Sequence, residues 1–292
     1  MSVAVDLQQM SFEDYCAHER MNASTIVHGF KSMLHLKRAM EGEVPEETAA
    51  MRFGQQYHKL ILEPEIFARD CVIEPDFGSH PDNVTDTGKR STRPNTKWAE
   101  ARRSEFASQN SGKAIVQQKY YDKMLKMLQS LHTHQSIPDL IRSSRREVSV
   151  FGKICHTEFK GRIDLLDLSG QWGITDLKGT NDVRPFRFGE LACRLCYPEK
   201  MAIYRELVRQ ETGQTLPVHI IAAETDGDFD RCLMPLPEPV LDHAFGRVYR
   251  LVLQYEDATK SGKWPGIDKG EELVDFYVPN YWMPDDEEME WS

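Results

Sequence analysis

Alternating apolar and polar residues over positions 155–168 constrain this chain more than any other feature. The alternation predicts a β-strand, and the turn residues at 169–171 followed by residues 172–178 predict an antiparallel return strand. One face is expected to carry Phe159, Ile163 and Leu165, and the other Lys160, Arg162 and Asp164. The chain is therefore expected to contain a β-hairpin with charged groups on one face.

The turn also predicts which residues of the hairpin face each other. A turn centred on Gly170 places Asp164 opposite Asp176, with Cβ atoms roughly 5 Å apart. Lys178 lies two residues beyond Asp176 and shares its face, whereas Leu177 points into the core. Two carboxylates and one ammonium group are therefore expected together on the sheet surface.

This group of charges is suited to a hard divalent cation. Two adjacent carboxylates raise one another's pKa unless a cation lies between them, and oxygen ligands suit Mg²⁺ or Mn²⁺. Lys178 beside such an ion would orient a water molecule or stabilise charge on a phosphate. On spacing alone, an exposed hairpin face with an ordinary Lys–Asp ion pair is an equally good interpretation.

The remaining periodicity predicts an α/β fold with a central mixed β-sheet flanked by helices and a helical N-terminal part. Helices are expected over 22–40, 47–62, 96–107, 113–131, 188–211 and 240–260. Further strands are expected over 147–151, 216–225 and 273–278, and a loop over 75–96. We interpret residues 1–292 as a single domain with a mainly helical part (22–140), a core (145–260) and a C-terminal tail (261–292).

Composition narrows the class of protein. The 292 residues are 40% hydrophobic, which excludes a disordered chain, and no run approaches the roughly 18 apolar residues of a membrane helix. A cytoplasmic protein without a membrane partner is expected. The 36 Lys and Arg against 46 Asp and Glu give a net charge of −10, which argues against a broadly basic surface. A basic channel within an acidic exterior remains compatible with that charge.

Several motifs resemble known nucleases. The pattern GRIDLL…ITDLKGT (161–180) resembles the PD-(D/E)xK, or restriction-endonuclease-like, core. Two helical motifs and a tail motif are similar to those of RecE-type exonucleases (exonuclease VIII-like): AAMRFGQQYH (49–58), LEPEIF (62–67) and SGKWPG (261–266) with VPNYW (278–282). The resemblance covers nearly the whole chain, from about Ser24 to Trp282.

The resemblance implies a metal centre and a catalytic lysine. The metal ligands would be His58, Asp164, Asp176 and the backbone carbonyl of Leu177, and Lys178 would be the catalytic lysine. Gly54, one turn before His58, would let its helix approach the sheet closely. Glu147 matches an acidic position of such cores, where it would hold a second ion or orient water, although a surface carboxylate is equally consistent. Scattered cysteines, with only Cys193 and Cys196 closely spaced, lead us to expect no iron–sulfur cluster.

The resemblance also implies contacts with DNA. Such nucleases carry Tyr-x-x-Gln-x-x-x-Tyr on the helix after the core, and here the residues are Tyr197, Lys200 and Tyr204. Tyr204 is assigned to the catalytic group, and Tyr197 and Lys200 to DNA binding. Lys200 can donate to a phosphate but cannot accept a hydrogen bond as glutamine does. Further DNA contacts are expected at Arg162, Ser24, Arg93 and Arg187, with Ser24 near a terminal 5′-phosphate; a solvated charged face is the alternative.

The activity that the resemblance implies is a Mg²⁺-dependent 5′-to-3′ exonuclease, with Mn²⁺ able to substitute. It would degrade one strand of linear double-stranded DNA and leave 3′ overhangs for a single-strand annealing protein. A ring-shaped homo-oligomer, tetramer or trimer, and a role in phage or prophage recombination in a bacterial host cell would follow. The alternatives are a single-strand-specific or endonucleolytic PD-(D/E)xK nuclease and a cleavage-deficient DNA-end-binding protein. Whether one or two metal ions are used stays open.

Overall fold

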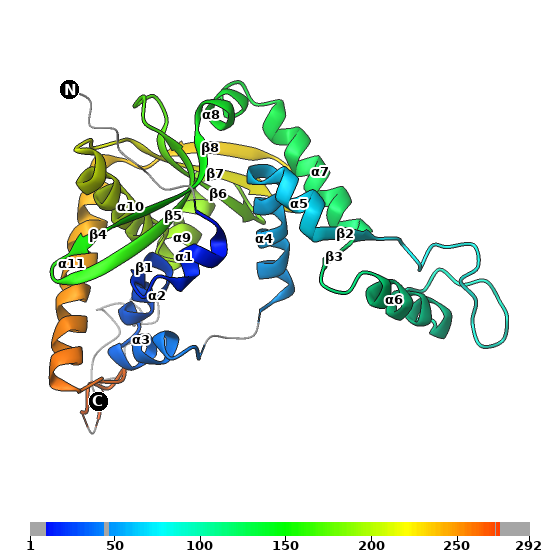
Figure 1. The fold of residues 1–292 in the computed structure, drawn as a ribbon, viewed down its shortest axis with the longest axis horizontal. Helices are drawn as coiled ribbons and strands as arrows, with labels where there is room; N and C mark the ends of the chain where they lie inside the picture. The colour runs from blue at the N-terminus through cyan, green and yellow to red at the C-terminus, as the bar shows by residue number, and fades with distance from the viewer. Residues whose placement is uncertain (1–9, 44–46, 272, 275–292) are drawn as a thin grey trace, which may run out of the picture.

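A computed structural model of the chain describes residues 10–43, 47–271 and 273–274. Its centre is a six-stranded mixed sheet flanked by helices (Figure 1). The strands are β1 (Met21–Asn22), β4 (Arg145–Ile154), β5 (Thr157–Asp167), β6 (Gly173–Thr180), β7 (Val218–Glu224) and β8 (Arg231–Pro235). Their order is β1-β5-β6-β7-β8, with β4 also paired to β5; the β1/β5 and β6/β7 pairs are parallel and the others antiparallel. The predicted α/β fold with a central mixed sheet is confirmed.

The register of the β5–β6 hairpin follows its turn as predicted. Leu165 pairs with Thr175 and Asp167 with Gly173, so the next position places Asp164 opposite Asp176. Ladder pairing ends there, because the N–H of Leu177 donates to the Asp164 carboxylate at 2.8 Å. The strands therefore separate at the acidic pair.

One expected feature of β5 is wrong. Phe159 and Ile163 pack into one hydrophobic cluster, whereas Leu165 packs into another on the opposite side of the sheet. The change of face occurs at Asp164, where strict alternation along the strand is interrupted. A local irregularity therefore lies at a candidate metal ligand.

Helices cover both faces of the sheet, each through its own hydrophobic cluster. One face packs against α10 (Tyr197–Thr212) and α11 (Glu238–Ser261). The other packs against α4 (Ala49–Leu62), α7 (Gln118–His132) and α8 (Ile137–Ser143). Among the residues that the structure describes, no helix is long and apolar enough to cross a bilayer.

Two expected single helices are interrupted. Residues 22–40 form α2 (Ala23–Ile26), the 3-10 helix η1 (Val27–Phe30) and α3 (Met33–Met40), because Ser32 adopts extended backbone and caps α3. Residues 188–211 divide into α9 (Pro185–Arg194) and α10, with Cys196 in the left-handed region at φ 57°. Pro198 lacks an N–H and is tolerated only in the first helical turn, so a new helix begins there.

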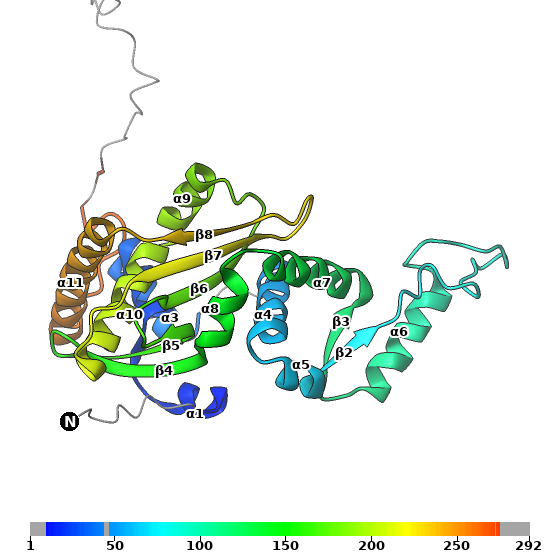
Figure 2. The ribbon, with the colours of Figure 1, turned by 90° about the horizontal axis from the view of Figure 1, so that it is seen from above.

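A separate arm projects from the core beyond α4 and α7 (Figure 2). It contains the parallel strands β2 (Cys71–Glu74) and β3 (Ala114–Gln117) and helix α6 (Lys97–Gln109). The helix expected from residue 113 therefore begins only after β3. The loop between β2 and α6 is held by the buried Asn83, whose amide donates to three backbone carbonyls at 2.8–3.0 Å. The remaining short helices are α1 (Phe12–Ala17) and α5 (Pro64–Asp70); the strand expected at 273–278 lies mostly outside the described residues.

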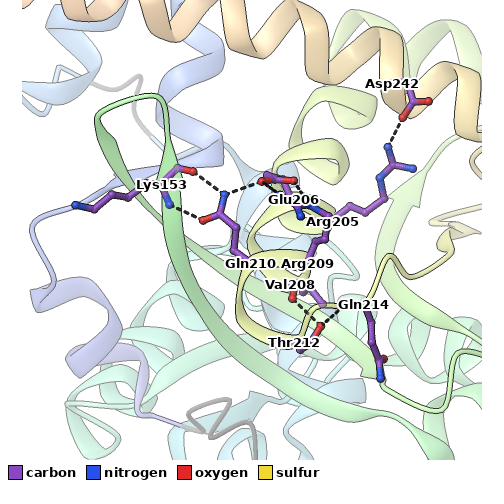
Figure 3. Close-up of polar contacts among 9 residues, drawn as sticks. All are labelled: Lys153, Arg205, Glu206, Val208, Arg209, Gln210, Thr212, Gln214 and Asp242. Carbon is purple, nitrogen blue, oxygen red and sulfur yellow. Dashed lines mark hydrogen bonds and ion pairs between the residues drawn. The ribbon is translucent and has the colours of Figure 1, made fainter. Parts of the chain in front are cut away.

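The C-terminal half of α10 is fixed to strand β4 (Figure 3). The Gln210 amide accepts from the N–H of Lys153 at 2.9 Å and donates to its carbonyl at 2.7 Å. A Cβ at Gly152 would lie 2.5 Å from the Gln210 side-chain oxygen and 2.9 Å from Leu207, so glycine permits this close approach. The contact sets the position of the helix that carries Tyr204 and Lys200.

Candidate active site

Three elements bring a histidine and two carboxylates together. His58 on α4, Glu147 on β4 and Asp164 on β5 each offer a ligand atom, and these atoms lie within 4.8 Å of one another. The Nδ1 atom of His58 is 3.4 Å from the carboxylate of Asp164. One nitrogen and several carboxylate oxygens form a donor set that Mg²⁺ or Mn²⁺ can use, so the residues fit a divalent ion.

Glu147 reaches this group through unusual backbone geometry. The flanking pairs Arg146–Leu165 and Val148–Ile163 place Glu147 opposite Asp164, and Glu147 has a φ of 51°. A non-glycine residue in the left-handed region inside a strand costs free energy that the surrounding structure must supply, and such residues cluster at functional sites.

The sequence was equally consistent with Glu147 as a surface carboxylate. In the structure its side chain is only 17% exposed, so that alternative is wrong. Burial, with the nearby charge of Asp164, raises the pKa of Glu147 to about 7 although Arg162 opposes the shift. A divalent cation would relieve the repulsion that contributes to this pKa.

Arg162 connects the carboxylates of the site. Its guanidinium donates to Glu147 and lies 3.4 Å from Glu63, and the side chain is only 11% exposed. In this structure the Arg162 guanidinium therefore contacts the carboxylates of Glu147 and Glu63. Its expected contact with DNA stays a prediction. Sequence reasoning assigned no role to Glu63. Its place in the Leu-Glu-Pro motif is the sequence feature that could have indicated that it belongs to the site.

Asp176 and Lys178 form a second part of the site. The buried Asp176 carboxylate makes an ion pair with Lys178, as their shared face predicted. Burial raises the pKa of Asp176, with Lys178 opposing and Asp164 adding to the shift. Burial lowers the pKa of Lys178, but Asp176 and Asp164 outweigh that effect and hold it above its ordinary value. Asp176 thus pairs with Lys178 and lies outside the group formed by His58, Glu147 and Asp164.

Leu177 points into the core and is fully buried, as expected. Its backbone carbonyl accepts from the Lys178 ammonium group at 3.3 Å, and its N–H donates to Asp164. The peptide of Leu177 thus lies between the two parts of the site, and the role of its carbonyl as a metal ligand stays a prediction.

Helix α10 brings an aromatic ring and a second lysine to the same place. The ring centroid of Tyr197 is 5.3 Å from the ammonium nitrogen of Lys178 and 5.4 Å from that of Lys200. Burial, and then the charge of Lys178, lowers the pKa of Lys200. Tyr204 lies against Gly161, and burial raises its pKa well above the ordinary value. The Tyr-x-x-Lys-x-x-x-Tyr segment therefore lies beside the Asp176–Lys178 pair.

The other expected DNA contacts do not join this group. Ser24 is exposed on α2, and Arg187 is 60% exposed on α9, where it pairs with Glu190 at 3.2 Å. Arg93 lies in the loop between β2 and α6, which belongs to the arm. Their contacts with DNA remain predictions.

The explanation predicted for Gly54 is wrong. A Cβ built at Gly54 would meet no atom within 4 Å, so no close approach of α4 to the sheet requires glycine there. Gly54 instead lines an open pocket next to the site.

Comparisons with known proteins bear on the fold and the family of this chain. The crystal structure of a candidate exonuclease from Eubacterium rectale has a TM-score of 0.62 and 14% identity, and covers 93% of this chain and 97% of that chain. At that identity the likeness shows the fold alone. The crystal structure of SSO0001 has a TM-score of 0.28 and 13% identity, with 55% of this chain and 71% of that chain covered, and carries no argument. No curated protein matches the chain.

Residues 23–272 match the family described as "PDDEXK-like domain of unknown function (DUF3799)". That range contains every residue of the candidate site, from His58 to Tyr204. The predicted PD-(D/E)xK superfamily is therefore confirmed, whereas none of these matches bears on RecE-type specificity. The chain belongs to the PDDEXK-like DUF3799 family.

Proposed function

We propose that this protein is a metal-dependent 5′-to-3′ exonuclease that hydrolyses one strand of linear double-stranded DNA and leaves 3′ overhangs. The observation that carries the proposal is the position of His58, Glu147 and Asp164 beside the Asp176–Lys178 ion pair. This arrangement provides a cation site and a fixed ammonium group within one small region. Phosphodiester hydrolysis requires both charge neutralisation and a positioned nucleophile.

The roles of the residues follow from their contacts. His58, Glu147 and Asp164 would hold Mg²⁺, with the Leu177 carbonyl and Asp176 nearby; when bound, the ion supplies an acidified water and neutralises charge on the phosphate. Lys178, paired with Asp176, would assist the nucleophile or stabilise negative charge on the phosphate. Lys200, across the Tyr197 ring, presents a second cation to the DNA backbone.

The exonucleolytic mode and the 5′-to-3′ direction rest on the RecE-like motifs, and the name of the Eubacterium rectale protein supports the former. The preference for Mg²⁺, the homo-oligomeric ring, the annealing partner, the recombination role and the cytoplasmic location belong to the same proposal. The ring, the annealing partner and the recombination role rest on the resemblance, the preference for Mg²⁺ also on the oxygen ligands, and the cytoplasmic location on the composition.

The test uses linear duplex DNA with a 5′-phosphate on one strand and a different fluorophore on each 3′ end. We expect Mg²⁺-dependent loss of the phosphorylated strand, and its abolition in Asp164→Ala and Lys178→Ala. Asp139→Ala and Lys153→Ala are matched controls, because these side chains are 66% and 63% exposed and lie on α8 and at the hairpin end of β4. Undiminished digestion by the site variants would overturn the mechanism.

Other outcomes identify the alternatives. Cleavage of closed circular DNA would indicate an endonuclease, and digestion of single strands only would indicate a single-strand-specific enzyme. Binding of DNA ends without digestion at any metal concentration would indicate a cleavage-deficient end-binding protein. Each of these results contradicts the proposed function.

A further inference from the structure

Cys193 and Cys196 lie at the junction of α9 and α10, and the proposed function does not use them. Cys193 is in the last turn of α9, and Cys196 is the residue from which α10 begins. All six cysteines of the chain are free, and only these two are separated by as few as two residues. Two thiols at this spacing are typical of chemistry that interconverts a dithiol and a disulfide.

The backbone reverses direction between the two cysteines. The N–H of Cys196 donates to the carbonyl of Cys193 at 3.1 Å. Between them, Arg194 is helical and Leu195 has φ −91° and ψ 7°, which are the angles of a type I turn. Such a turn keeps the Cα atoms of its first and last residues within about 7 Å, and a disulfide spans about 4.4–6.8 Å between Cα atoms. The two cysteines therefore lie at a backbone separation that a disulfide can bridge.

The side chains differ in access but lie near each other. Cys193 is exposed, so an oxidant in solution can reach its sulfur, and Cys196 is half-buried. Burial, and then the charge of Glu199, raises the pKa of the Cys196 thiol, and the neighbouring Cys193 adds to the shift. The exposed thiol would therefore react first, with the second thiol next to it.

The backbone of Cys196 is the second observation that points to a function. Its φ of 57° lies in the left-handed region, where glycine is favoured at the end of a helix. Other residues in this region cost free energy and cluster at functional sites. In the described part of the chain, neither thiol belongs to a group of three metal ligands. The pair is therefore suited to a bond between its own sulfur atoms rather than to a metal ion.

We infer that Cys193 and Cys196 are a redox-sensitive pair that hydrogen peroxide converts into a disulfide. The peroxide transfers one oxygen atom to the Cys193 sulfur, which becomes a sulfenic acid, and leaves as water. The Cys196 sulfur then attacks this sulfur: the S–S bond forms, the S–O bond breaks, and the hydroxyl group leaves with the Cys196 proton as a second water. Two electrons pass from the thiols to the peroxide, and a dithiol reductant reverses the change.

The disulfide would join α9 to α10 directly before Tyr197. The Tyr197 ring lies 5.3 Å from the ammonium nitrogen of Lys178 and 5.4 Å from that of Lys200. The modified junction therefore belongs to the segment that positions these side chains. The chemistry of the pair does not depend on the proposed nuclease activity.

Trypsin provides a direct test, because it cleaves after Arg194, between the two cysteines. The folded full-length protein is treated with hydrogen peroxide, its remaining thiols are alkylated during denaturation, and it is digested without reductant. We expect peptides 188–194 and 195–200 to be joined by a disulfide, at least about tenfold more abundant than any other cysteine pair, because the short turn gives the two thiols a high effective concentration. Dithiothreitol should separate the two peptides.

Two variants complete the experiment. Cys193→Ser should abolish the joined peptides and leave Cys196 open to alkylation, whereas Cys16→Ser, which removes another exposed thiol, should leave the joined peptides unchanged. The inference is overturned if the wild-type peptides are recovered separately, with Cys193 still alkylated or oxidised to a sulfinic or sulfonic acid. Joining of Cys196 to other cysteines as often as to Cys193 would overturn it as well.

Discussion

Replacement of Gly161 by alanine tests how closely strand β5 and helix α10 are matched at the site. A Cβ at Gly161 would lie 2.8 Å from two ring carbons of Tyr204 and 3.2 Å from a methyl of Val150. To restore even a tight contact of 3.4 Å, the tyrosine ring must move by roughly 0.6 Å. The partly buried ring packs against the core cluster, so we expect α10 to take up part of the displacement.

The magnitude follows from that displacement. Overpacking of a buried site costs about 1–3 kcal/mol, so we expect Gly161→Ala to lower the free energy of unfolding by about 2 kcal/mol. Lys200 lies one helical turn before Tyr204, and a misplacement approaching 1 Å at an active site can cost about 100-fold in rate. We therefore expect DNA digestion to fall by about 10- to 100-fold.

The assay combines urea unfolding, followed by circular dichroism, with digestion of linear duplex DNA. Gly246→Ala on α11 is the matched control, because its nearest neighbour would be 3.7 Å away, an ordinary contact; we expect unchanged or higher stability. The double variant Gly161→Ala with Tyr204→Leu should be less destabilised than the two single changes predict together. A destabilisation of Gly161→Ala below about 0.5 kcal/mol, or strict additivity of the two changes, would refute the reasoning.

Three further predictions concern the site and its support. Asp164→Asn should abolish binding of Mn²⁺ measured by calorimetry, because it removes the carboxylate shared by His58 and Leu177; wild-type affinity in this variant would exclude the ligand set. Glu147 has a folded pKa raised to about 7, so the folded state binds more protons than the unfolded one above pH 5. The metal-free protein should therefore lose stability as pH rises from about 5 through 7, and Mg²⁺ or Glu147→Gln should reduce that slope in thermal melts; an unchanged slope in Glu147→Gln would contradict the assignment. Lys160→Met should release α1, because the buried ammonium donates to the carbonyls of Tyr15, Cys16 and His18 at 2.7–3.2 Å; hydrogen exchange in residues 12–17 should accelerate by at least about tenfold, and unchanged protection would show that other contacts hold the helix.

Local sequence rules were sufficient for the hairpin. The turn at Gly170 determined the register and the opposed Asp164 and Asp176, and alternation along β6 determined the shared face of Asp176 and Lys178 and the inward Leu177. These features depend on residues within about one strand length of each other, so no long-range contact was needed to predict them. The role of His58 at the same site was predicted only through the resemblance of its motif to a family.

Other features depend on contacts between distant segments. Glu147 adopts left-handed backbone and the chain changes face at Asp164, where β4 and β5 pair. Arg162 forms its ion pairs there with Glu147 and with Glu63, the residue between α4 and α5. The break at Cys196 and the fixation of Gln210 on β4 likewise reflect how α10 packs. Periodicity reports which residues are apolar but not which distant element will cover them, so a continuous helix was the natural expectation over 188–211.

The sequence by itself determined the sheet hairpin, its register and the acidic and basic groups that one face presents, because backbone geometry couples neighbouring residues directly. Only the tertiary structure decided that Glu147 joins His58 and Asp164 and that Asp176 instead pairs with Lys178. Gly54 lines a pocket, and the packing of α4 against the sheet does not require glycine there. These outcomes depend on the relative placement of elements up to about a hundred residues apart in the chain, which is set by the packing of two hydrophobic clusters on opposite faces of the sheet.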